Sequence, residues 1–249
     1  MSSSLDSLPK RTWSWHSPAL GRSMDVACWG SFGLPVILFP TAGGDFEECE
    51  RFHLVSALAP LIQAERIKLY SVGSISRDAW LDPQARPWHK SWLQGRFDQY
   101  LASELLPHVE RDCGGFRGFV AAGASLGAYN AVTVATRHPE WFKLVIAMSG
   151  TYDFDRWMGN HRDDDYYFHQ PLYFLPHLGD GDILQALQRV RFVIATGQGR
   201  FEAPWESDRL VQILKSKGVP AQLELWGHDV HHDWPTWRSM LPLFLDKLV

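Results

Sequence analysis

The sequence predicts an α/β fold with a mostly parallel central sheet and helices on both faces. Short apolar runs, such as residues 34–39 (LPVILF) and 67–72 (IKLYSV), have the length and β-branched composition of buried strands. Between such runs lie segments with apolar residues at helical spacing, and this alternation is typical of a parallel sheet covered on both faces. A chain of 249 residues, 45% of them hydrophobic, suits one domain spanning residues 1–249.

The predicted elements follow one another regularly along the chain. We expect strands at residues 24–29, 34–39, 67–72, 117–122, 142–148, 191–195 and 221–226, and helices at residues 49–64, 94–112, 126–137, 183–189, 207–217 and 236–248. Gly114 and Gly115 end the second helix, and Pro139 ends the third. Residues 152–181 are rich in Asp, His, Tyr, Trp and Pro without a clear period, so they predict an excursion over the sheet.

Charge and cysteine content exclude several classes of protein. The net charge is -4 and the basic residues are scattered, so neither nucleic acid nor an anionic membrane is an expected partner. Three irregularly spaced cysteines do not make a disulfide framework, which favours a reducing compartment. The first residues lack a signal-peptide pattern, and no apolar run is long enough to span a membrane. We therefore expect a soluble, cytoplasmic protein.

Residues 123–127 (GASLG) form a GxSxG motif. The motif lies between a predicted strand and a predicted helix, which is the context of the nucleophile elbow in the α/β-hydrolase fold. Gly123 and Gly127 leave room for the sharp turn that exposes the Ser125 hydroxyl. Ser125 is therefore the candidate nucleophile. A phosphate-binding turn is the weaker alternative, because no lysine follows as in a P-loop and the third glycine of a dinucleotide fingerprint is absent.

A serine nucleophile needs a general base, which in this fold follows the last strand. Residues 226–234 (WGHDVHHDW) follow the strand predicted at residues 221–226 and contain three histidines, His228, His231 and His232. The imidazole and carboxylate groups of this segment are also possible metal ligands. We favour the base, because the segment lies where a hydrolase requires one.

Several segments resemble the esterase family that includes S-formylglutathione hydrolase (esterase D), enterobactin esterase and the mycolyltransferases. The segments are GASLG itself, HSPALGRSMDV from residue 16, the SG of MSGTYD after residue 148, and HDWPTWRSMLPLFL from residue 232. The resemblance covers nearly the whole chain, though loosely. It implies an α/β-hydrolase fold and identifies His232 as the base, with His228 and His231 as its neighbours.

The acid of the triad is expected after the strand at residues 191–195, where it would orient the imidazole. The loop there reads TGQGRFEAPWESD, and its run Gly197–Glu202 is similar to the acid loop of the family. We therefore expect Glu202 to be the acid, with Glu206 and Asp208 as alternatives. Many family members carry Asp at this turn, whereas this loop has no Asp before position 208.

The oxyanion hole requires two backbone N–H donors. The first is expected from Leu126, and the second from the loop after residues 34–39, with Ala42 favoured over Thr41. That loop usually begins His-Gly in the family, whereas this chain reads PTAGG. Side chains expected to contact substrate, although each also fits a packing position, are Thr41, Trp80, Tyr152 and Trp157; Ser76, Arg77, Asp153 and Tyr173 are further candidates.

These residues predict a serine carboxylesterase that forms an acyl-enzyme on Ser125. Its partner is a small-molecule ester, and the mechanism requires no cofactor or metal. Two alternatives stay open. The same acyl-enzyme could serve an acyltransferase, and the missing His-Gly signature is compatible with a non-catalytic binding member of the fold.

Overall fold

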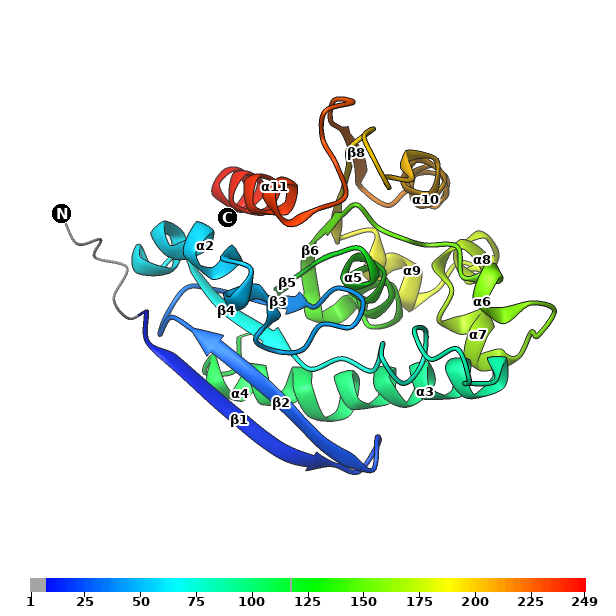
Figure 1. Ribbon diagram of the computed structural model, residues 1–249, viewed down its shortest axis with the longest axis horizontal. Coiled ribbons are helices and arrows are strands. Elements are labelled where there is room, and N and C mark those ends of the chain that lie inside the picture. Colours follow the sequence, from blue (N-terminus) through cyan, green and yellow to red (C-terminus); the bar gives the residue numbers. More distant parts are fainter. Residues whose placement is uncertain (1–7, 117) are drawn as a thin grey trace.

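Figure 1 shows a computed structural model of the protein, which describes residues 8–116 and 118–249. The strands are β1 (Lys10–Ser17), β2 (Arg22–Trp29), β3 (Leu34–Phe39), β4 (Ile67–Val72), β5 (Phe119–Ala124), β6 (Phe142–Met148), β7 (Arg191–Thr196) and β8 (Ala221–Leu225). They form one eight-stranded sheet in the order β1-β2-β4-β3-β5-β6-β7-β8. β2 runs antiparallel to β1 and β4, and the other neighbouring pairs are parallel. The predicted fold class is therefore confirmed.

Helices cover both faces of the sheet (Figure 1). α2 (Leu54–Gln63) and α11 (Trp234–Leu248) pack on one face, whereas α3 (Pro87–Tyr100), α5 (Leu126–Arg137) and α10 (Pro204–Ser216) cover the other. Two hydrophobic cores, one on each face, result from this arrangement. The remaining helices are α1 (Glu48–Arg51), the π-helix η1 (Leu101–Leu105), α4 (Leu106–Asp112), the 3-10 helix η2 (Pro139–Trp141), α6 (Asp155–Met158), α7 (Asp164–Phe168), α8 (Pro171–His177) and α9 (Asp182–Leu187).

Among the described residues, no helix has the length and apolar character needed to cross a membrane. The excursion expected at residues 152–181 contains the three short helices α6, α7 and α8. They pack against α3, α5 and α10 at the end of the molecule away from β1 (Figure 1).

The helix expected at residues 49–64 is two helices, α1 and α2. The break follows from His53, whose φ of 61° is incompatible with a continuing right-handed helix. Phe52, directly before this break, is exposed and stacks on Trp234, with ring centroids 4.6 Å apart. The contact joins the end of α1 to the start of α11, far away in the chain.

Two strands also differ from expectation. β1 was not predicted, although Trp13 and Trp15 alternate with polar residues at the period of a strand with one covered face. β5 begins and ends later than the predicted range 117–122, and it therefore ends at Ala124, directly before Ser125. The nucleophile position thus follows the strand without an intervening loop.

The sheet order identifies where a ligand site should lie. β3 lies between β4 and β5 in the sheet. The connection from β3 to β4 therefore runs toward one edge of the sheet, and the connection from β4 to β5 runs back past β3 toward the other edge. In open α/β sheets, ligands bind in the crevice at the carboxyl ends of such strands. The loop after β3 starts at Pro40, and Ser125 follows β5. The parallel strands β6, β7 and β8 deliver their following loops to the same end of the sheet.

A buried carboxylate on α3 lies beside the histidines that directly follow α5 and α7. Asp98 of α3 is 7% exposed, and its Oδ1 lies 3.0 Å from His138 Nε2 while its Oδ2 lies 3.3 Å from His169 Nε2. Burial alone would raise the pKa of Asp98, but the hydrogen bond with His138 and the electrostatic interactions with His138 and His169 outweigh burial and hold the pKa well below its usual range. The group therefore stabilises the fold in its ionised form.

Asp98→Ala is expected to lower the free energy of unfolding at pH 7 by about 3 kcal/mol, because it leaves polar partners buried without their acceptor. Since the folded pKa lies below the unfolded one, this stabilisation is present above about pH 4 and is lost as the pH falls. Urea unfolding at neutral and acidic pH measures both effects. A difference between the wild type and the variant that grows toward acidic pH would contradict this account.

Candidate active site

Ser125 lies in a strained turn between β5 and α5. Its φ of 57° and ψ of -123° fall outside the regions that non-glycine residues favour. A Cβ at position 123 would lie 2.2 Å from Gly127 O, and a Cβ at position 127 would lie 2.3 Å from Phe39 O. Only glycine allows these approaches, so Gly123 and Gly127 permit the sharp turn expected from the motif.

The start of α5 presents free donors beside Ser125. The first N–H groups of a helix have no partner within the helix, and they carry the positive end of its dipole. Within the described residues, Leu126 N has no hydrogen-bond acceptor. This N–H is therefore free to bind an anionic oxygen next to Ser125.

Glu202 and His232 lie together at the carboxyl ends of β7 and β8. His232 Nδ1 is 3.8 Å from Glu202 Oε2, and Glu202 is 8% exposed. Burial favours a raised pKa for Glu202, but the interactions with His232 and Ser149 outweigh burial and lower the pKa below its usual range. Within the part of the chain that is described, Ser125 Oγ makes no hydrogen bond with His232. Such bonds are often long in ligand-free enzymes.

Two side chains outside the predicted set bond to Glu202, and a third bonds to one of them. Ser149 Oγ donates to Glu202 Oε1 at 2.7 Å, Thr196 Oγ1 donates to Glu202 Oε2 at 3.1 Å, and Trp237 Nε1 donates to Ser149 Oγ at 3.0 Å. Trp237 also meets the His232 ring edge-on, with centroids 5.2 Å apart. The only sequence signal for Ser149 was its place directly after a strand, in the SG pair.

Backbone hydrogen bonds join the loop that carries Glu202 to the loop that carries His232. Gly199 N donates to Val230 O at 2.9 Å, and His232 N donates to Arg200 O at 3.2 Å. His231 Nδ1 accepts from Arg200 N at 2.9 Å, so this histidine fastens the loop rather than facing Glu202. In residues 8–116 and 118–249, no three His, Cys, Asp or Glu side chains are grouped so that they could hold a metal ion.

The alternative acids are engaged elsewhere. Glu206 Oε2 accepts the backbone N–H groups of Tyr152 and Asp153. Asp208 is exposed on α10, where Gln212 Nε2 approaches it at 3.4 Å. Within the described part of the chain, neither carboxylate bonds to His232.

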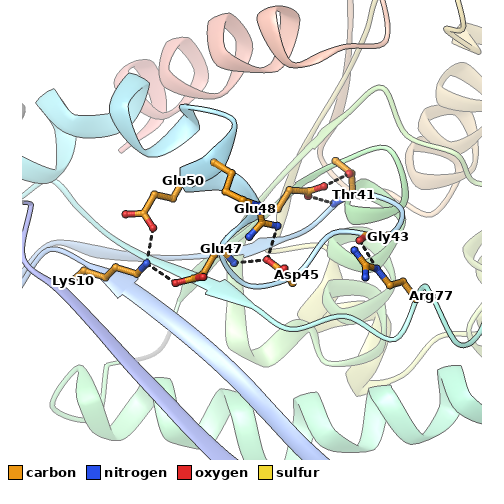
Figure 2. A network of polar contacts seen from close by, with 9 residues as sticks. Lys10, Thr41, Gly43, Asp45, Glu47, Glu48, Glu50 and Arg77 are labelled. Atoms are coloured by element: carbon orange, nitrogen blue, oxygen red, sulfur yellow. Dashed lines mark hydrogen bonds and ion pairs between the residues drawn. The ribbon is translucent and has the colours of Figure 1, made fainter.

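In the loop after β3, the N–H groups of Thr41 and Ala42 differ in their partners, and Figure 2 shows the bond of Thr41. Thr41 N donates to Glu48 Oε2 at 2.8 Å, so this N–H is occupied. Ala42 N, in contrast, has no acceptor among the described residues. Burial raises the pKa of Glu48 above its usual value, even though its hydrogen bonds to Thr41 act in the opposite direction.

The residues expected to contact substrate lie in different environments. Tyr152 is 0% exposed and Trp80 is 3% exposed, so both side chains pack in the core instead of facing an opening. Trp157 is half-buried, with the Arg156 guanidinium 4.0 Å from its ring centroid. Arg77 is exposed and donates from Nε to Gly43 O at 2.7 Å. Of these four, Trp157 and Arg77 present surface to solvent.

Comparison with known proteins adds a family and a set of similar folds. The model of the Putative esterase family matches residues 73–246. A ferulic acid esterase superposes with a TM-score of 0.73 at 19% identity, covering 95% of this chain and 96% of that chain. The S-formylglutathione hydrolase FrmB of Staphylococcus aureus gives 0.70 at 15% identity, with 96% and 95% covered. MPT51 (FbpC1) of Mycobacterium tuberculosis gives 0.71 at 17% identity, with 97% and 98% covered. No curated protein sequence matches significantly.

Proposed function

Because the chain belongs to the Putative esterase family, we propose that its serine hydrolase chemistry is carried by Ser125, His232 and Glu202. Membership confirms the family resemblance expected from the sequence and makes the protein a carboxylic ester hydrolase. The solved structures, at their low identities, show the fold alone. The assignment of residues is our inference from the geometry of the site.

In the proposed mechanism, Ser125 Oγ attacks the ester carbonyl carbon while His232 takes the hydroxyl proton. Glu202 orients the imidazole and stabilises its charged form. The N–H groups of Leu126 and Ala42 bind the oxyanion. His232 then protonates the departing alcohol, and a water molecule, activated by the same imidazole, releases the acid from the acyl-enzyme.

One observation carries this proposal: Glu202 is buried beside His232, held by Ser149 and Thr196, with its pKa lowered. A solvated surface carboxylate would not be held in this way, because burying a charge is costly unless it is paired. The strained turn at Ser125 supports the proposal independently. Such strain persists mainly where function requires it.

A fluorophosphonate probe tests the proposed function directly. The wild-type protein is expected to form a covalent adduct, and peptide mass mapping should locate it on Ser125. Hydrolysis of a panel of p-nitrophenyl esters should accompany labelling, and prior labelling should abolish it. A wild-type protein that neither labels nor hydrolyses any ester would refute the function.

Glu202→Gln is expected to lower kcat by about 10⁴-fold, because a neutral amide stabilises neither the required tautomer nor the charged form of His232. Steady-state kinetics on a p-nitrophenyl ester measure the loss. Glu206→Gln is the matched control and should keep kcat within about tenfold, because Glu206 binds backbone N–H groups instead of His232. Equal losses in the two variants would show that Glu202 is not the acid.

A further inference from the structure

A buried carboxylate holds the loop between β3 and α1 (Figure 2). Glu48 is 6% exposed, and it accepts hydrogen bonds from Thr41 N at 2.8 Å and from Thr41 Oγ1 at 2.6 Å. Thr41 is thus engaged through both its backbone and its side chain. The peptide that joins Thr41 to Ala42 carries the Ala42 N–H group. Because Thr41 is held by Glu48, the orientation of this N–H group is restricted.

The glycines of this loop make the arrangement possible. A Cβ at position 44 would lie 2.3 Å from Glu48 Oε2, so only glycine leaves room for the carboxylate. Gly44 N also donates to Thr41 O at 3.1 Å, and Gly43 has a φ of 73°, which favours glycine. On the other side, Arg77 Nε donates to Gly43 O at 2.7 Å. The loop is therefore held from α1 and from the segment after β4.

The same loop touches the helix that follows Ser125. A Cβ at position 127 would lie 2.3 Å from Phe39 O and 2.7 Å from Pro40 O, so the start of the loop lies against the first turn of α5. In the sheet, β3 pairs with β5, and Phe39 lies opposite Gly123. A displacement of the loop would therefore move the N–H group of Ala42 relative to Ser125.

We propose that Glu48 is a positioning residue of the oxyanion hole: by accepting the N–H of Thr41, it leaves the N–H of Ala42 to face the acyl oxygen. The inference rests on the function proposed above. In this proposal, Glu48 holds the loop after β3, which begins Pro-Thr in this chain instead of the His-Gly that is usual in the family. Glu48 contacts neither the ester nor Ser125 in this proposal, because it acts through Thr41.

Glu48→Ala is expected to lower kcat for a p-nitrophenyl ester by about 100-fold, since misplacing an oxyanion donor costs roughly that much. KM should stay within about threefold, because the contact acts in the transition state. Glu48→Gln keeps an oxygen that accepts Thr41 N–H, so its kcat should lie within about tenfold of the wild type. Glu50→Ala is the matched control, because this exposed glutamate on the same helix bonds to Lys10 instead and should leave kcat unchanged.

A trifluoromethyl ketone analogue of the ester separates positioning from general loss of structure. Ser125 Oγ adds to its carbonyl carbon and passes its proton to His232, so the ketone oxygen becomes an oxyanion in the hole. The alcohol with the same skeleton binds without this addition. Glu48→Ala should weaken ketone binding at least about tenfold more than alcohol binding. Equal weakening of both ligands, or a wild-type kcat, overturns the proposal.

The wild-type protein distinguishes failure of this inference from failure of the function. A wild type that labels and hydrolyses esters, together with an unimpaired Glu48→Ala variant, refutes only the role of Glu48. A wild type that does neither refutes the function, and the role of Glu48 falls with it. Loss of kcat in Glu48→Ala with recovery in Glu48→Gln supports both.

Discussion

Ser125→Ala is expected to lower the hydrolysis rate of a p-nitrophenyl ester by about 10⁶-fold, because no other group can form the acyl-enzyme. Fluorophosphonate labelling should disappear completely. The variant should fold like the wild type, since alanine faces the same strained φ of 57° and loses only a hydroxyl. Circular dichroism and thermal unfolding check this, and the initial rate of hydrolysis measures the effect.

Ser149→Ala provides the contrast for this experiment. It removes a hydroxyl that donates to Glu202 Oε1, so it should slow turnover while labelling persists. If labelling persisted in Ser125→Ala but disappeared in Ser149→Ala, the nucleophile would be Ser149 and the assignment of Ser125 would be wrong.

His232→Ala should have an effect of similar size, about 10⁶-fold on kcat, because nucleophile and base act as one unit. Without an internal base, the residual rate should keep rising with hydroxide concentration, whereas the wild-type rate should reach a plateau. A pH–rate profile distinguishes the two behaviours.

His228→Ala is the matched control, because this histidine is exposed and lies four residues before His232 in the same loop. Its kcat should stay within about threefold of the wild type, as for other surface substitutions. His231 is less suitable, because its Nδ1 holds Arg200 N and its removal would loosen the acid loop. If His228→Ala lost activity and His232→Ala kept it, the base would be misassigned.

The sequence determined the fold class and the order of strands β2 to β8, because both depend on patterns within short segments. Apolar runs and helical periodicity are local, and so is the GxSxG motif, in which Gly123 allows a close approach to Gly127 O four positions away. The family match over residues 73–246 agrees with the resemblance drawn from such segments.

Tertiary structure decided how the groups of the site are held, because these contacts join residues far apart in the chain. Ser149 meets Trp237 across 88 positions and Glu202 across 53, and no local pattern records such pairs. Packing likewise buries Tyr152 and Trp80, which the sequence alone could not distinguish from pocket residues. The sequence by itself likewise did not identify Glu48 as the acceptor of the Thr41 N–H group, whereas Ala42 N has no acceptor among the described residues.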